Sequence, residues 1–106
     1  MVKEELLQII LKFILEKPKT QAAEIHQHVF EILKQRGLVG EKTTRHPGYT
    51  STTFVRMSDS DAMLVNEIIY DLIILRVLTP GINADNLEWP WISLTSEEKL
   101  RTYLRE

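Results

Sequence analysis

Residues 58–94 read SDSDAMLVNEIIYDLIILRVLTPGINADNLEWPWISL, and they carry the signals of a central helix followed by a β-hairpin. Ser58 and the carboxylates after it are typical of a helix start, because a hydroxyl caps the first turn and the helix dipole favours acids there. The apolar residues that follow cover more than one helix face, which indicates a central helix packed on several sides. They are Leu64, Val65, Ile68, Ile69, Leu72, Ile73 and Leu75. Residues 77–79 and 89–94 then predict two short strands, with a turn at Pro80-Gly81.

Two amphipathic helices are expected before this stretch. Apolar residues at steps of three and four predict the first over residues 2–16, and Pro18 ends it because proline cannot continue a helix. We expect Thr20 to cap a second helix over residues 21–36, with Gly37 as its left-handed stop.

The segment between the second and third helices, residues 38–57, has no helical period. Its hydroxyl, glycine and aromatic content, with Pro47-Gly48 as a tight turn, indicates a loop or a frayed hairpin. If it pairs, residues 43–46 lie against residues 49–54, since the latter carry β-branched and aromatic side chains.

The carboxyl-terminal residues predict one more helix, because Thr95 and Glu98 have the spacing of a capping box. The expected fold is one domain over residues 1–106, mainly α with a small β-hairpin, in the order helix-helix-loop-helix-strand-strand-helix. A four-helix arrangement with an irregular hairpin is the alternative.

Composition narrows the class of protein. With 43% hydrophobic and 26% charged residues the chain is expected to fold, and with no cysteine it has neither disulfides nor a thiolate metal site. No apolar run has the roughly 20 residues of a membrane span, and the amino-terminal residues are unlike a signal peptide. We therefore expect a cytoplasmic protein without a membrane partner.

Three runs, Val65–Ile73, Val77–Gly81 and Trp89–Thr95, resemble the third helix, the wing and the following helix of winged helix-turn-helix modules, in particular regulatory modules appended to larger bacterial proteins. The resemblance lies mainly in residues 58–106. It implies a winged-helix-like fold, with a three-helix core backed by a small sheet. For the family at large it also implies duplex DNA binding through the third helix and the wing.

The charges of the chain argue against DNA contacts through the third helix and the wing. The third helix begins with Asp59 and Asp61, and the wing carries Asp85 and Glu88 without a lysine or arginine, so both elements would repel phosphates. The segment 34–56 instead has five cations against one acid, a net charge of +4, which leaves −6 for the rest of the chain. We therefore take these residues as the candidate nucleic-acid contacts: Lys34, Arg36, Lys42, Arg45, His46 and Arg56.

No motif of a catalytic or metal site is present. His26 and His28, two positions apart on a helix, point to different sides, and the pair Glu24 and His28 has no third ligand. We find no nucleophile elbow and no phosphate-binding glycine loop, so we expect no enzyme activity, no cofactor and no metal.

Two functions are compatible with these features. The first is binding of nucleic acid through the basic segment. The second is protein interaction, in which the winged helix is a scaffold that forms a homodimer or docks on other domains of a larger protein. Trp89 and Trp91 are the candidate interaction residues, as an exposed aromatic platform for a partner or for a single-stranded base. Strand alternation favours instead that at least one of the two rings packs onto the third helix.

Overall fold

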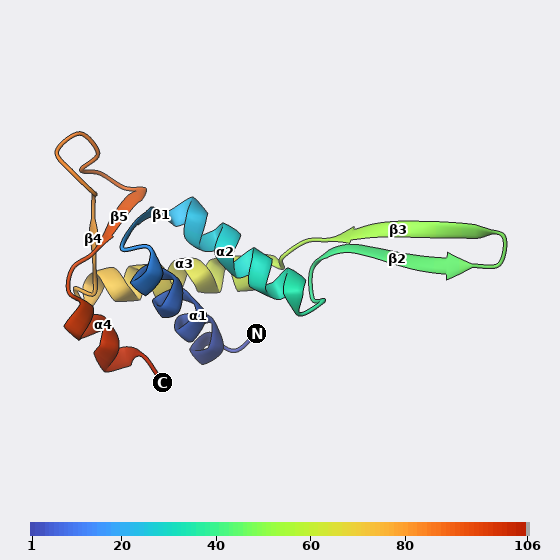
Figure 1. Ribbon diagram of the computed structural model, residues 1–106, viewed down its shortest axis with the longest axis horizontal. Coiled ribbons are helices and arrows are strands. Elements are labelled where there is room, and N and C mark those ends of the chain that lie inside the picture. The colour runs from blue at the N-terminus through green and yellow to red at the C-terminus, as the bar shows by residue number, and fades with distance from the viewer. Residues whose placement is uncertain (106) are drawn as a thin grey trace.

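The computed structural model describes residues 1–105 and contains four helices and five short strands (Figure 1). In chain order the elements are α1 (Lys3–Glu16), β1 (Lys19–Gln21), α2 (Ala22–Gln35), β2 (Gly40–His46), β3 (Tyr49–Val55), α3 (Asp59–Ile74), β4 (Leu78–Pro80), β5 (Trp91–Leu94) and α4 (Glu97–Tyr103). The four predicted helices are confirmed, and the bounds predicted for the first two, residues 2–16 and 21–36, differ from α1 and α2 by no more than one residue at each end.

The core lies where α1, α2 and α3 meet, and β4, β5 and α4 each add one side chain to it (Figure 1). The apolar stripes recognised in the sequence face this core, and each buried leucine or isoleucine stabilises the fold by about 1.5–3 kcal/mol. The largest fully buried side chains are Leu6, Ile10, Leu11, Ile14, Ile25, Leu33, Ile68, Ile69, Leu72, Leu78, Ile92 and Leu100.

A three-stranded antiparallel sheet closes one end of the core, in the order β1-β5-β4. Strand β1 corrects the sequence prediction of a two-stranded hairpin, since Thr20 pairs with Ile92 of β5. Thr20 is buried in this strand and does not cap α2. The cap is Gln21, which forms a capping box with Glu24, while the Thr20 hydroxyl donates to the Glu24 carboxylate at 2.6 Å.

Strands β2 and β3 form a long hairpin, called the arm below (residues 40–55). Its seven pairs run from Gly40↔Val55 to His46↔Tyr49, around a turn in which Gly48 has φ +82°. The alternative of an irregular loop is wrong, and the predicted pairing is correct but too short. The arm projects from the helices at the end opposite the three-stranded sheet, and the molecule measures 58 × 33 × 22 Å (Figure 1).

Two helix starts test the capping predictions. Ser58 caps α3 as expected, since its hydroxyl accepts from the Asp61 amide at 3.1 Å. The cap of α4 is Ser96, whose hydroxyl accepts from the Lys99 amide, and not Thr95, whose hydroxyl pairs with the Thr79 hydroxyl of β4.

The predicted hairpin after α3 is present as β4 and β5. Trp89, however, precedes β5 and belongs to the connection between the two strands, called the β4–β5 loop below (residues 81–90). The fold is thus a mixed α and β arrangement of helices and small antiparallel sheets.

None of the helices in residues 1–105 is long and apolar enough to cross a membrane.

Candidate functional site

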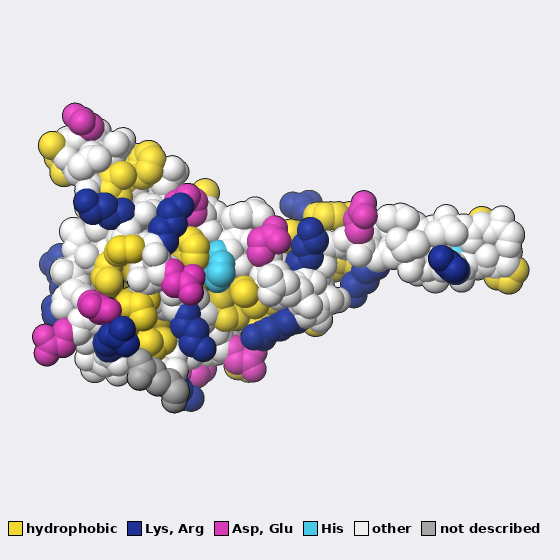
Figure 2. Space-filling model, viewed as in Figure 1, with side chains coloured by type: hydrophobic (Ala, Val, Ile, Leu, Met, Phe, Trp, Pro, Cys, Tyr) yellow, Lys and Arg dark blue, Asp and Glu magenta, His cyan; other side chains and the backbone are white. Residues whose placement is uncertain are grey.

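The six basic candidate residues are all exposed and follow the arm from its root to its tip. We call them the basic surface: Lys34, Arg36, Lys42, Arg45, His46 and Arg56. Lys34 and Arg36 lie at the end of α2, Arg56 follows β3, and Arg45 is two residues from the turn. Figure 2 shows lysine and arginine side chains around the root of the arm and one on the arm itself.

The residues of the basic surface that belong to the arm lie on two different faces of it. Side chains alternate between the two faces of a strand, so Arg45 lies on one face of the arm, and Lys42 and His46 lie on the other. At about 3.3 Å per residue, β2 extends on the order of 20 Å. The basic residues therefore form a track around a thin ribbon and not one compact patch.

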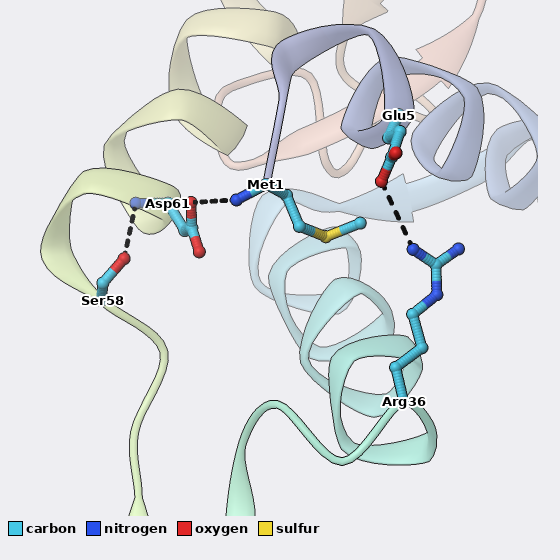
Figure 3. A network of polar contacts seen from close by, with 5 residues as sticks. All are labelled: Met1, Glu5, Arg36, Ser58 and Asp61. Atoms are coloured by element: carbon cyan, nitrogen blue, oxygen red, sulfur yellow. Dashed lines mark hydrogen bonds and ion pairs between the residues drawn. The ribbon is translucent and has the colours of Figure 1, made fainter.

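Arg36 differs from the other cations because it has an intramolecular partner. Its Nη1 lies 3.5 Å from Glu5 Oε2 of α1 (Figure 3). In the same region the Met1 amino group lies 3.3 Å from Asp61 Oδ1, which joins α1 to the start of α3. Within residues 1–105, the other cations of the basic surface form no ion pair: Lys34, Lys42, Arg45 and Arg56.

The tip of the arm combines an aromatic stack with hydroxyl groups. The rings of His46 and Tyr49 stack with centroids 4.6 Å apart, and His46 Nε2 lies 3.2 Å from the Ser51 hydroxyl. Other hydroxyls cover both faces of the arm: Thr43, Thr44, Thr50, Thr52 and Thr53. Cations and hydroxyls of this kind are suited to phosphate oxygens.

A second surface, which we call the α3–loop face, is apolar. Met63, Tyr70 and Ile74 recur at helical spacing on α3 and are 65%, 51% and 75% exposed. Trp89 of the β4–β5 loop stacks on Tyr70 with centroids 5.2 Å apart, and Leu87 is also exposed. Six of the eleven exposed large hydrophobic side chains in residues 1–105 lie on α3 or its cap and on this loop.

The prediction that a tryptophan packs onto the third helix agrees with the Trp89–Tyr70 stack. The stack covers only part of the ring, since Trp89 remains 40% exposed. Met63 and Ile74 also remain exposed, so the other helices cover α3 only in part.

The elements that form the α3–loop face also carry acidic residues. Glu67 and Asp71 bind Lys3 of α1 at 3.3 and 2.9 Å, and Asp71 first and then Glu67 raise the pKa of that lysine. Asp85 and Glu88 of the loop have no cationic partner within residues 1–105. The basic and acidic segments predicted from the sequence are therefore separated in space, with cations on the arm and unpaired carboxylates on the loop.

The β4–β5 loop encloses an open hollow of about 410 Å³. It is lined by Ala84, Asp85, Asn86, Leu87, Glu88, Trp89 and Trp91. Hydrogen bonds within the loop order it: Asn83 Oδ1 accepts from the Asp85 and Asn86 amides, and the Ile82 amide donates to the Asn86 carbonyl at 2.8 Å. The two tryptophans were predicted from the sequence, whereas Tyr70 and the hollow were not.

The other polar candidates have structural roles. Glu24 binds Lys17 and Thr20, and these contacts lower the pKa of its carboxyl group. His28 stacks on Phe13, and His26 lies 2.7 Å from the Asn66 side chain. Within residues 1–105, no three metal-ligating side chains come together.

Comparison with protein-family models, curated proteins and solved structures gives no match to this chain.

Proposed function

We propose that this chain is a non-enzymatic winged-helix module that binds nucleic acid through the basic surface of its arm. The observation that carries this proposal is the position of Lys42 and Arg45. Both are exposed on a projecting ribbon and neither is neutralised by an acid within residues 1–105. Phosphate contacts from such groups supply most of the affinity of a non-specific complex.

Two features support the winged-helix scaffold. Three helices share one core that a small antiparallel sheet backs, and the projecting β4–β5 loop follows the third of them. These are the features that the resemblance of residues 58–106 implies. The arm accounts for the long connection between α2 and α3, which is unusual for a helix-turn-helix.

The arm is a better nucleic-acid contact than α3 on electrostatic grounds. Asp59 and Asp61 at the start of α3, and Asp85 and Glu88 of the loop, would meet phosphates with like charge. A two-stranded ribbon, by contrast, has the dimensions that the major groove of duplex DNA admits. The hydroxyls of the arm would add contacts to the phosphate backbone.

Fluorescence anisotropy with labelled duplex and single-stranded DNA, at low and moderate salt, tests this proposal. We expect duplex binding that weakens steeply with salt, and we expect Arg45→Glu to weaken it by about tenfold or more. Lys12→Glu is the matched control, since Lys12 is exposed on α1 and has no ion pair within residues 1–105. No binding at low salt would overturn the function, and an unchanged curve for Arg45→Glu would overturn the choice of surface.

A second candidate function is protein interaction, with the same fold as a scaffold. The exposed α3–loop face favours it, because Met63, Tyr70, Ile74 and Trp89 present apolar area that water solvates poorly. The partner would be a second copy or another domain of a larger protein. Light scattering over a concentration range separates these cases, since a constant monomer mass excludes the second copy.

A further inference from the structure

The hollow of the β4–β5 loop combines aromatic rings with carboxylates. Trp89 and Trp91 are among its lining residues, together with Asp85 and Glu88, whose carboxylates no cation of residues 1–105 neutralises. Indole faces attract cations that lie within about 6 Å of the ring centroid, and carboxylates attract them more strongly. The chemistry of this lining therefore selects a positive group.

The hollow is also held in shape before any ligand enters. Asn83 organises the turn, and the Gly81 amide donates to the Trp91 carbonyl at 2.6 Å, which ties the start of the loop to its end. The stack of the Trp89 ring on Tyr70 of α3 fixes the position of this side chain. A preformed site loses less conformational entropy on binding than a flexible loop would.

The surroundings indicate what carries the positive group. The hollow adjoins the α3–loop face through the Trp89–Tyr70 stack, so a ligand seated there continues onto Met63 and Ile74. Figure 2 shows hydrophobic and acidic side chains on the projecting loop, with lysine or arginine only at its base in that view. A peptide with apolar and basic residues complements this surface better than a free inorganic cation does.

We propose that the hollow binds an arginine side chain of a partner protein, whose neighbouring apolar residues lie on the α3–loop face. Arginine suits it because the planar guanidinium stacks on an indole ring and donates two parallel hydrogen bonds to a carboxylate. This inference rests on the second function proposed above and is independent of nucleic-acid binding.

The two tryptophans of the chain both line the hollow, so intrinsic tryptophan fluorescence reports on this site. The probe is a short, acetylated and amidated peptide that alternates leucine and arginine. Versions with lysine or glutamate in place of arginine serve as comparison. We expect a saturable change in tryptophan emission with the arginine peptide. The lysine peptide should have a several-fold larger dissociation constant, and the glutamate peptide should leave the emission unchanged.

The variant Asp85→Asn/Glu88→Gln removes both carboxylates and should raise the dissociation constant by about tenfold or more. Neither side chain makes a hydrogen bond within residues 1–105, so the loop should keep its structure. Glu16→Gln/Glu31→Gln removes the same charge from α1 and α2 and should leave binding within about twofold. Circular dichroism checks that both variants are folded.

Two results separate failure of this inference from failure of the docking function. Equal affinity for the arginine and glutamate peptides, or the same loss in both double variants, would overturn arginine recognition while leaving an apolar docking face. No saturable change with any of the peptides would overturn arginine recognition and count against the docking function as well.

Discussion

Gly81 is buried at the start of the β4–β5 loop with φ +97°, and a Cβ there would lie 2.6 Å from the Leu87 carbonyl oxygen. Gly48 in the turn of the arm has φ +82° but nothing within 4 Å of its Cβ position. Both positions strain an alanine, which costs about 1–2 kcal/mol, and only Gly81→Ala adds a backbone clash. In urea unfolding we expect Gly81→Ala to lose at least about 1 kcal/mol more than Gly48→Ala. Equal losses would contradict this account of the loop.

Glu24 ties α2 to the sheet through its carboxylate. Lys17, and then the Thr20 hydroxyl, lower its pKa in the folded protein below its ordinary value of 4.5. A depressed folded pKa contributes stability above pH 4.5 that is lost as the pH falls through the folded value. Glu24→Gln should therefore cost about 0.5–1 kcal/mol at neutral pH, and less as the pH falls below 4.5.

Urea titrations of the wild type and of Glu24→Gln, at neutral pH and near pH 3, measure this difference. Glu16→Gln is the control, since Glu16 lies at the end of α1 and its side chain has no hydrogen bond or ion pair within residues 1–105. A difference between wild type and Glu24→Gln that is the same at both pH values would show that the charge of Glu24 contributes nothing.

Capping residues show the limit of sequence reasoning at this scale. Thr20 and Thr95 are good caps by residue type, and each lies one position before the residue that does the capping. Neither acts as the cap, because Thr20 belongs to β1 and the Thr95 hydroxyl pairs with the Thr79 hydroxyl of β4. Local propensity cannot include a strand partner that comes from far along the chain.

Among the elements, the arm depends least on the body. Its residues between Lys42 and Thr53 are mostly exposed, while Phe54 stacks near Phe30 of α2 with centroids 6.3 Å apart. Deleting residues 43–46 together with 49–52 places the Pro47-Gly48 turn directly on the pair Lys42↔Thr53 and preserves the alternation of the ladder.

We expect this shortened arm to change the free energy of unfolding by no more than about 0.5 kcal/mol, because little apolar area is lost. DNA affinity should fall by at least as much as in Arg45→Glu. Thermal unfolding followed by circular dichroism gives the first quantity, and anisotropy gives the second. A large loss of stability would show that the arm packs on the body, and unchanged DNA affinity would rule the arm out as the contact.

The elements that sequence reasoning found share a strong apolar period. Helices α1 and α2 bury one stripe each, so their spacing predicts them. The arm has water on both faces and lacks the alternation of a half-buried strand, and β1 has three residues, too few for any period. Helix α3 is different, because its apolar residues lie on more than one face and the sequence alone does not separate the exposed ones from the buried ones.

For the whole molecule, the charge separation places the two proposed contacts at opposite ends. The arm extends from one end of the long axis, and the β4–β5 loop stands at the other (Figure 1). The chain measures 58 Å along this axis, several times the Debye length of about 8 Å at physiological salt. The basic surface and the acidic loop are therefore screened from each other, and each is free to bind its own partner.

The same geometry predicts an extended particle in solution. A compact chain of this length has a radius of gyration of about 13 Å, whereas the Cα atoms here give 16.5 Å. Small-angle X-ray scattering should reproduce the larger value at low concentration, and the shortened arm should lower it by about 2 Å. Forward scattering extrapolated to zero concentration reports the mass, so dimerisation is not mistaken for extension. A monomer with a radius near 13 Å would mean that the arm folds back onto the helices, and the basic surface would then not be a projecting ribbon.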